Sequence, residues 1–404
     1  KNHYDTNLSK YKNKEFDKRR VARELVQGGG GQSRSLSSYF VSTSLAELVQ
    51  SIGPNMLALF VSLSAAGGSK LGLCCEECTA AQYAPFAKSA KWVYRYSLFV
   101  DDTSTAAWLS SNNVEFVPHL AHKLVPLSNS SAHSACTFNA DDAKKYLPLC
   151  TDTMLDSALT TKTNQRLSMR YMMGWNEAYD DSGSKKEKKY IAPADAATYW
   201  RTFVQGLALR HNLTLVSPTT GVTKGKLEWM GDMLKACWKD RSRGCDVETI
   251  QAFSVHDYKC SETYWSENYG RNGTFQTNLK AYLGGADKDW KAYVDARPIW
   301  VTETNCNGDY GFPPTQSVSR SEQCMRITGQ RADQDCGLYG KCGVGSIAWM
   351  ETSPTIGRVS WWNTHQQNKK NATKTFDAML VGTTGELFPA GKALANGLIT
   401  MDCS

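Results

Sequence analysis

No apolar run in this 404-residue sequence is long enough to cross a lipid bilayer, which takes roughly 20 residues of helix. Even the run that begins at Met56 falls short of that length. No internal repeat is visible either. We therefore expect no membrane anchor. A chain of this length holds one large α/β domain with an extension, or two ordinary domains, and has a sizeable core.

Metal-ligand spacings are missing as well. The seven histidines include no His-x-x-x-His pair, and no second Cys-x-x-Cys motif completes Cys74-Cys75-x-x-Cys78 as half of a metal site. The basic runs Lys10–Arg23 and Lys185–Lys189 lack the interleaved aromatic residues and the recognisable module of a nucleic-acid surface. We predict disulfides in place of a metal site, no cofactor, and no nucleic-acid partner.

Cysteine is abundant, with thirteen residues in the chain. Asn-x-Ser/Thr sequons begin at Asn7, Asn129, Asn212, Asn272 and Asn371. Both features point to the secretory route, so we expect a secreted protein, extracellular or in a cell wall. An odd number of cysteines leaves at least one thiol free or paired outside the chain, and the pairing cannot be deduced from sequence.

Residues 1–68 are interpreted as an N-terminal extension. Its first half is polar and basic and ends in Gly28–Gly31, which is typical of a disordered segment or linker. The segment from Met56 to Gly68 resembles the apolar core of a secretion signal followed by small residues, although no basic leader stands directly before it. A helix packed beside the main domain is the other interpretation, and both remain open.

From residue 69 onward, short apolar runs alternate with amphipathic stretches. Residues 194–209 have helical apolar spacing and follow Pro193, which suits a first helical turn. This alternation predicts a (β/α)8 barrel, a TIM barrel in the α/β class, over residues 69–404. The eight expected strands are Leu71–Cys74, Trp92–Tyr96, Val114–Pro118, Tyr171–Trp175, Leu213–Val216, Ala252–Val255, Ile299–Val301 and Arg358–Trp361.

Two of these strands run into a single carboxylate. Tyr171–Glu177 and Pro298–Glu303 are each apolar up to their final residues, and we expect Glu177 to end the fourth strand and Glu303 the seventh. The carboxyl ends of barrel strands carry the active site. Glycoside hydrolysis needs a proton donor and a second carboxylate on the other face of the sugar. The pair therefore predicts a glycosidase; alternatively, each Glu only ends a strand in a surface loop.

The order of motifs along residues 69–401 resembles glycoside hydrolase family 128, the catalytic core of retaining endo-β-1,3-glucanases in clan A. Single motifs such as Asn-Glu are weak, but their joint order is specific. The segments are Lys70–Leu73, Trp92–Ser97, Val114–His119, Gly174–Glu177, Ser254–Tyr258, Trp300–Thr304, Val359–Trp362 and Ala378–Pro389.

The resemblance implies roles for the residues around the two carboxylates. Glu177 matches the general acid/base, and Glu303 matches the nucleophile. Asn176 would bond the sugar's 2-hydroxyl, where contacts tighten in the transition state. His256 and Tyr258 match the pair beside the nucleophile, and a tyrosyl hydroxyl donating to Glu303 would favour the charged form of that carboxyl.

Further residues are expected to touch the sugar. Trp361 or Trp362 matches the aromatic residue that forms the floor of the central sugar site. His119, at the end of the third strand, is placed to bond sugar hydroxyls, and Tyr96 is a further candidate. We expect only one member of the pair Tyr94 and Tyr96, and only one of the two tryptophans, to face the interior or cleft at a given level.

This chain departs from the family pattern in three places. Ala178–Asp180 replaces the usual Pro-Asp after Asn-Glu, and Asp257 replaces the usual Trp between His256 and Tyr258. An insert, Asn305–Cys342, carries four cysteines and is interpreted as a disulfide-braced loop at the cleft or as a surface decoration.

The predicted protein is thus a monomeric hydrolase that takes a β-glucan polysaccharide or oligosaccharide as its substrate. Two alternatives remain. One is an inactive carbohydrate-binding or wall-associated protein, against which the intact Glu177 and Glu303 argue. The other is a clan A hydrolase acting on another β-glycan.

Overall fold

The computed structural model describes residues 69–75, 78–120, 152–180, 190–284, 288–306, 320–329, 345–364 and 379–397. The predicted N-terminal extension, with its linker and its signal-like segment, lies outside the described residues, as do both basic runs and most of the insert. No helix in the described part of the chain is both long and apolar enough to span a membrane.

All eight predicted strands are present in the described residues, and they form one parallel sheet in the order β3-β2-β1-β8-β7-β6-β5-β4. A parallel bridge between His119 and Met173 links the two ends of this order, so the sheet curls into a barrel. The predicted α/β TIM-barrel class is confirmed. The strands are β1 (Leu71–Cys74), β2 (Trp92–Tyr94), β3 (Glu115–Phe116), β4 (Tyr171–Met173), β5 (Thr214–Val216), β6 (Ile250–His256), β7 (Ile299–Thr304) and β8 (Ile356–Trp361).

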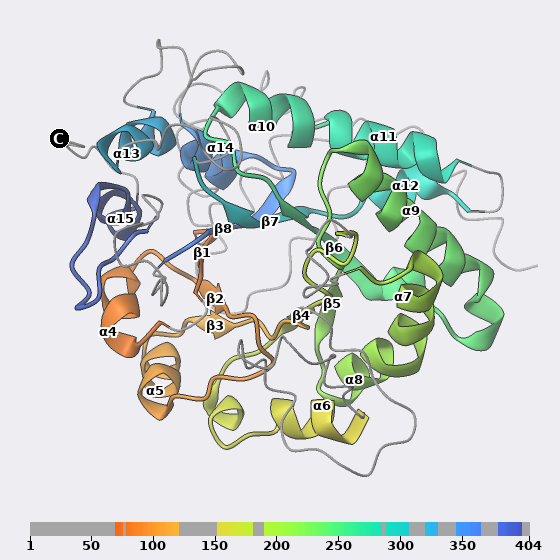
Figure 1. Ribbon diagram of the computed structural model, residues 1–404, viewed down its shortest axis with the longest axis horizontal. Coiled ribbons are helices and arrows are strands. Elements are labelled where there is room, and N and C mark those ends of the chain that lie inside the picture. The colour runs from red at the N-terminus through yellow and green to blue at the C-terminus, as the bar shows by residue number, and fades with distance from the viewer. Residues whose placement is uncertain are drawn as a thin grey trace, which may run out of the picture. The chain divides into compact units, whose positions relative to one another are not determined.

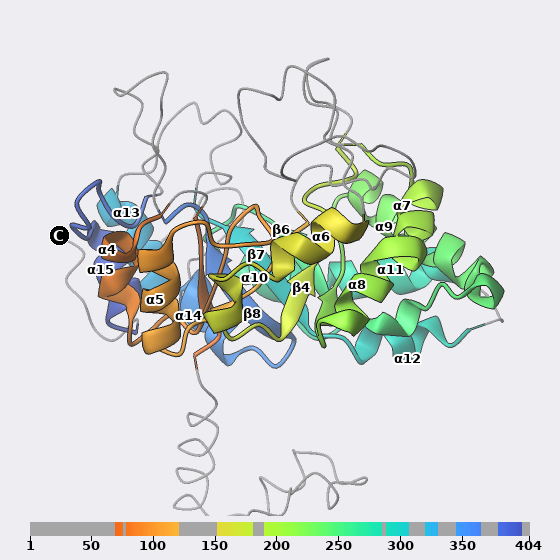
Figure 2. The ribbon, with the colours of Figure 1, turned by 90° about the horizontal axis from the view of Figure 1, so that it is seen from below.

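Helices surround the strands (Figure 1). Figure 2 shows α4, α5 and α15 to one side of the strands and α8, α11 and α12 to the other. The predicted helix over residues 194–209 is present as α7, a π-helical turn at Trp200–Val204, and α8, with Pro193 in the first turn. The described helices are α4 (Ala80–Tyr83), α5 (Thr103–Ser111), α6 (Asp152–Leu159), α7 (Pro193–Tyr199), α8 (Gln205–Arg210), α9 (Lys224–Lys239), α10 (Glu262–Tyr269), α11 (Thr274–Leu283), α12 (Trp290–Asp295), α13 (Arg320–Thr328), α14 (Ser346–Thr352) and α15 (Pro389–Ala395).

Alternate strand residues fill two separate cores. Outward side chains such as Leu73 and Phe253 pack under the helices, whereas inward ones such as Trp92 and Trp300 fill the barrel. A Cβ atom on Gly72 would lie 2.2 Å from the Trp92 ring, so only glycine leaves room for that ring. Large side chains fill the interior of the barrel. The polar groups at the carboxyl ends of the strands therefore lie on a packed core and not over a pore.

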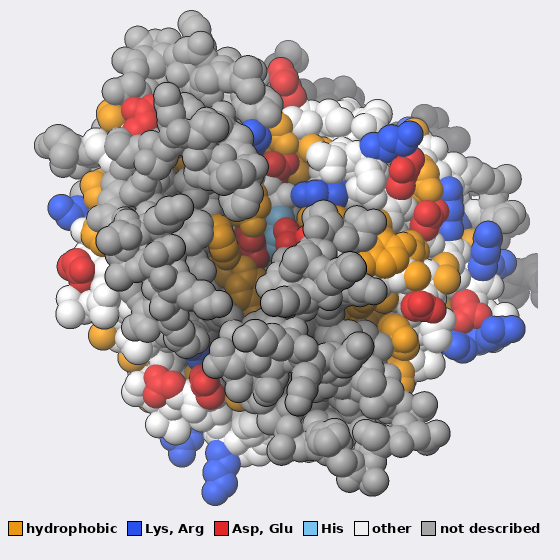
Figure 3. All heavy atoms as spheres, in the orientation of Figure 1, with side chains coloured by type: hydrophobic (Ala, Val, Ile, Leu, Met, Phe, Trp, Pro, Cys, Tyr) orange, Lys and Arg blue, Asp and Glu red, His pale blue; other side chains and the backbone are white. Residues whose placement is uncertain are grey.

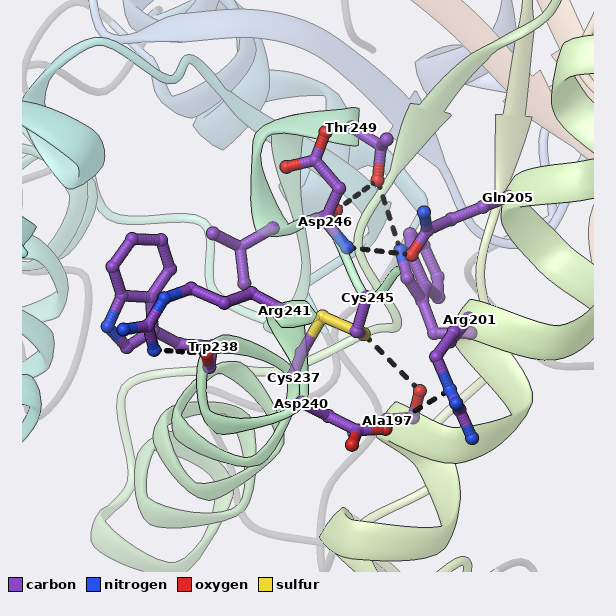
Figure 4. Close-up of a disulfide and its surroundings, with 12 residues drawn as sticks. Ala197, Arg201, Gln205, Cys237, Trp238, Asp240, Arg241, Cys245, Asp246 and Thr249 are labelled. Carbon is purple, nitrogen blue, oxygen red and sulfur yellow. Dashed lines mark hydrogen bonds and ion pairs between the residues drawn. A yellow bond between two sulfur atoms is a disulfide. The ribbon is translucent and has the colours of Figure 1, made fainter. Parts of the chain in front are cut away.

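Three disulfides join described cysteines: Cys75–Cys78, Cys237–Cys245 and Cys260–Cys306. The first confirms that the Cys74–Cys78 motif forms a disulfide, and Cys74 itself is a buried thiol. The second closes the end of α9 onto the segment before β6 (Figure 4). The third joins the loop after β6 to the loop after β7, and thus connects the two segments that carry Tyr258 and Glu303.

Replacing both Cys260 and Cys306 by serine should lower the free energy of unfolding by about 4 kcal/mol, since the bridge closes a loop with a sequence separation of 46. The matched control is the double serine variant of Cys75 and Cys78, whose separation is 3. The same loop-entropy relation gives that control a loss of only about 1.6 kcal/mol. Denaturant unfolding measures both losses, and equal losses would contradict the assigned role of the longer bridge.

Candidate active site

Glu177 lies in the loop after β4 and does not end the strand as the sequence suggested, since β4 stops at Met173. Two backbone hydrogen bonds hold this loop to the end of β5 and the segment after it. The amide of Gly174 donates to the carbonyl of Val216 at 3.0 Å, and that of Thr219 donates to the carbonyl of Trp175 at 2.9 Å. Asn176 is buried beside Glu177, whose side chain is 20 % exposed. The loop thus brings a reachable carboxyl over the barrel mouth.

The backbone of Glu177 is left-handed, with φ of 46°. This conformation costs a residue with a side chain roughly 1–2 kcal/mol. The amide of Asp180 donates to the Glu177 carbonyl at 2.9 Å and helps to close the turn. Such strain is common where a side chain must be held in a functional position.

Because of this φ, the free energy of unfolding of the Glu177→Gly variant should exceed that of Glu177→Ala by about 1 kcal/mol, as measured by denaturant unfolding. Glycine adopts the left-handed region without a Cβ penalty. The control is Ala107→Gly on the exposed face of α5, where glycine should be the less stable residue by about 1 kcal/mol. If Glu177→Ala and Glu177→Gly have equal free energies of unfolding, the turn is not strained.

Glu303 reaches the barrel interior through an irregularity in β7. Val255 pairs with Val301, but the next residue of β6, His256, pairs with Glu303. One extra residue therefore stands in β7, as in a β-bulge. Strict alternation would turn Glu303 outward, beneath the helices, because Thr302 points inward and its hydroxyl lies 2.7 Å from that of Ser254. The bulge lets both consecutive residues face inward.

Tyrosine hydroxyls surround the Glu303 carboxyl, which is 4 % exposed. Tyr96 donates to Oε1 and Tyr258 donates to Oε2. Tyr94 lies 3.5 Å from Oε1 and also donates to the Thr302 carbonyl at 2.8 Å. The structure thus brings the predicted residues Tyr96 and Tyr258 together on one carboxyl and adds Tyr94.

One imidazole lies close to both carboxyls. His256 Nδ1 lies 3.3 Å from Glu177 Oε1, and its Nε2 lies 3.3 Å from Glu303 Oε1. The ring is buried at the end of β6. Glu177 and Glu303 therefore both lie beside the same ring, each near a different nitrogen.

Burial raises the pKa of Glu303, and the charge of Glu177 adds to this rise, whereas His256 and the hydroxyls of Tyr258 and Tyr96 act in the opposite direction. Burial also raises the pKa of both tyrosines well above the usual value, so they remain protonated donors. One carboxyl is thus deeply buried among donors and the other is partly open. Different environments for two carboxyls are what separate acid and base roles.

The two tryptophans at the end of β8, Trp361 and Trp362, have different positions. Trp361 is fully buried in the core beneath the helices. Trp362 is partly buried, with its ring 5.6 Å from that of Tyr258. Only Trp362 lies beside the site, in agreement with the expectation for alternating neighbours.

The same expectation does not hold for Tyr94 and Tyr96. Both rings pack in the interior of the barrel, because the two-residue period of β2 continues from its last residue, Tyr94, to Tyr96. His119 is buried beside them, with its ring centroid 5.4 Å from that of Tyr94 and 5.7 Å from that of Tyr96. His119 therefore lies next to two of the tyrosines that contact Glu303.

Two further residues with contacts at the site, Tyr179 and Asp257, lie where the chain departs from the family pattern, and the sequence indicated no role for either. The hydroxyl of Tyr179 lies 3.4 Å from Glu177 Oε1. Asp257, whose pKa is raised by burial, accepts hydrogen bonds from Tyr264 and Tyr269. These two hydrogen bonds tie the segment between His256 and Tyr258 to α10.

The face that carries this site is hollowed at its centre. In Figure 3, acidic side chains and a histidine lie in the hollow, with hydrophobic side chains around them. Two carboxyls, donor hydroxyls and aromatic faces in such a hollow suit acid/base and nucleophilic chemistry on a polyhydroxylated ligand.

No curated protein matches the chain significantly. Solved structures that resemble it include an endo-β-1,3-glucanase of glycoside hydrolase family 128, subgroup II, from Sorangium cellulosum, with 18 % identity and a TM-score of 0.49 over 80 % of this chain and 97 % of that one. Another is the subgroup I endo-β-1,3-glucanase from Amycolatopsis mediterranei with laminaritriose, at 15 % identity and a TM-score of 0.43 over 81 % and 99 %. A third is a subgroup VII oligosaccharide-binding protein from Trichoderma gamsii, at 15 % and 0.42 over 82 % and 94 %.

The family model for a glycosyl hydrolase catalytic core matches residues 131–393, which is more than half of the chain. The prediction of a glycoside hydrolase is thereby confirmed. The chain belongs to the glycosyl hydrolase catalytic core family.

Proposed function

We propose that this glycoside hydrolase cleaves β-1,3-glucan with retention of configuration, with Glu177 as acid/base and Glu303 as nucleophile. The observation that supports these roles most directly is the pair of carboxyls that each lie 3.3 Å from His256, one buried among tyrosine hydroxyls and one partly open. The order of motifs along the sequence supports β-1,3-glucan as the substrate. Endo action is part of the proposal.

In the first step, the Glu303 carboxylate attacks the anomeric carbon while Glu177 gives its proton to the leaving oxygen. The glycosidic bond breaks, and its electrons stay on that oxygen. In the second step, ionised Glu177 takes a proton from water, which attacks the same carbon and releases Glu303. Neither step calls for a metal or an organic cofactor.

The hydrogen bonds around Glu303 suit this role. Hydroxyls of Tyr96 and Tyr258 favour the ionised carboxyl against the effect of burial, and a nucleophile must be ionised. The same bonds fix the carboxyl in one orientation. Burial excludes water and strengthens each of these interactions.

Other residues would bind the sugar. Asn176, buried beside Glu177, would bond the 2-hydroxyl. Trp362, next to Tyr258, offers a flat apolar face to the pyranose ring. His119 and Tyr96 would offer further polar groups to the sugar hydroxyls.

We also infer a secreted, monomeric protein. The three disulfides among described residues favour an oxidising compartment.

The proposal is tested by incubating the purified protein with linear β-1,3-glucan, β-1,4-glucan and mannan and separating the products. Short oligosaccharides from β-1,3-glucan alone are expected. Products from another polymer would overturn the substrate assignment. Binding of β-1,3-oligosaccharides without products would show a binding protein instead of an enzyme.

A further inference from the structure

Tyr179 contacts the partly open carboxyl of the site. It follows Glu177 in the loop after β4, and its hydroxyl lies 3.4 Å from Glu177 Oε1. The same oxygen lies 3.3 Å from His256 Nδ1. Oε1 is thus held between a phenol on its own loop and an imidazole on β6.

A lysine from another element holds the ring of Tyr179. Lys226, in the first turn of α9, places its Nζ 4.9 Å from the ring centroid. This is within the range of a cation–π contact. The Thr220 hydroxyl donates to the Lys226 carbonyl at 3.0 Å, which ties this turn to the segment after β5.

The phenol of Tyr179 remains protonated. Burial raises its pKa most, and the charges of Glu177, Glu303 and Asp180 raise it further. A protonated phenol donates its hydrogen bond to an acceptor, and ionised Glu177 is a better acceptor than the protonated acid.

We propose that Tyr179, held by Lys226, is a positioning residue for the acid/base Glu177 that keeps Oε1 in place and favours its ionised form. The inference rests on the proposed role of Glu177. It assigns Tyr179 to the second step, in which Glu177 must accept a proton from water. Tyr179, two residues after Glu177, stands where the chain departs from the family pattern. The departure therefore places a hydrogen-bond donor beside the acid/base carboxyl.

Other charged and titratable groups also face Glu177. His256 lies at the end of β6, Glu303 comes from β7, and Tyr258 lies in the turn after β6. None of these groups changes in a Tyr179→Phe variant, which removes one hydroxyl and keeps the ring under Lys226. A change in the titration of Glu177 in that variant therefore reports the lost hydrogen bond.

The chain provides a matched control on its outer helices. Tyr282 donates to Asp232 at 2.8 Å, and Lys235 places its Nζ 4.2 Å from that ring. The same three types of group thus occur together, away from the proposed site, on α9 and α11. Tyr282→Phe removes an equivalent hydroxyl there.

The experiment compares the pH profiles of kcat/KM for a short β-1,3-glucan oligosaccharide in wild type, Tyr179→Phe, Lys226→Met and Tyr282→Phe. Loss of the donor favours protonated Glu177, so the alkaline limb should move up by about half a pH unit to one unit in Tyr179→Phe. Lys226→Met should move it in the same direction by less, and Tyr282→Phe should leave it unchanged. An unmoved limb in Tyr179→Phe, or an equal shift in Tyr282→Phe, would overturn the inference.

A second readout does not depend on turnover. In protein carrying ¹³C-labelled glutamate carboxyls, the Glu177 signal is assigned by its absence in Glu177→Gln. Its titration midpoint should rise in Tyr179→Phe and stay constant in Tyr282→Phe. If wild type hydrolyses no glucan but the midpoint rises, the proposed function fails and the contact of Tyr179 with Glu177 stands; a constant midpoint refutes the contact.

Discussion

Glu303→Gln should lower the turnover of β-1,3-glucan by about 10⁴-fold or more, because an amide cannot attack the anomeric carbon. Binding of β-1,3-oligosaccharides should be largely retained. Glutamine keeps the shape of the side chain and can still accept a hydrogen bond from Tyr258 or Tyr96. Single-turnover kinetics and calorimetric binding measure the two effects separately, and retained turnover would remove Glu303 from the mechanism.

The same substitution should stabilise the fold at neutral pH. Burial raises the pKa of Glu303 in the folded protein above its ordinary value of 4.5. The folded state therefore binds this proton more tightly than the unfolded state does. Its contribution to stability is complete below the unfolded pKa and is lost as the pH rises through the folded pKa.

Glutamine has no such dependence on pH. The gain in unfolding free energy of Glu303→Gln over wild type should therefore be larger at pH 7 than at pH 4. Urea unfolding at the two pH values measures this difference. A gain that grows on acidification would contradict the direction of the shift.

Glu177→Ala should lose about 10²- to 10⁴-fold in turnover of unactivated glucan, since no group remains to protonate the leaving oxygen. With an activated aryl glycoside the first step needs little acid assistance. The glycosyl-enzyme then accumulates because no base activates water. Azide should restore turnover by occupying the vacated place and attacking the anomeric carbon.

The control for this rescue is Glu303→Gln, in which azide should restore no turnover by this route, since the site still holds Glu177 and lacks the nucleophile. The product of the rescued reaction should be a β-glycosyl azide. Failure of azide to accelerate Glu177→Ala with the activated substrate would remove the acid/base role from Glu177.

The barrel could be predicted from the sequence because its strands are buried on both faces. Runs such as Leu71–Cys74 and Ile299–Val301 are therefore apolar throughout. Each run is short and bounded by helical stretches, which leaves few topologies. The order of such runs along the chain was enough for the fold class.

The geometry of the site was harder to predict, because it depends on contacts between strands. The extra residue in β7 is visible only when His256 is paired with Glu303 across two strands. The position of Glu177 beyond the end of β4 depends on backbone hydrogen bonds to the end of β5 and the segment after it. No local pattern reports either feature.

Tyr94 and Tyr179 show two different reasons for a missed residue. Tyr94 follows from the two-residue period of a strand, and a consistent use of that period would have placed it beside Tyr96. Tyr179 lies in an irregular loop, where the direction of a side chain follows from φ values such as that of Glu177. Its cation–π contact joins segments distant in sequence, so the sequence alone could not indicate it.

Trapping the covalent intermediate tests whether Glu303 is the nucleophile. The protein is incubated with a 2-deoxy-2-fluoro β-glucosyl or laminaribiosyl donor that carries an activated leaving group, and the intact protein and its peptides are weighed by mass spectrometry. One added glycosyl group is expected on the peptide that contains Glu303, and none in Glu303→Gln. A label on another residue, or an enzyme that hydrolyses β-1,3-glucan and takes up no label, would contradict it.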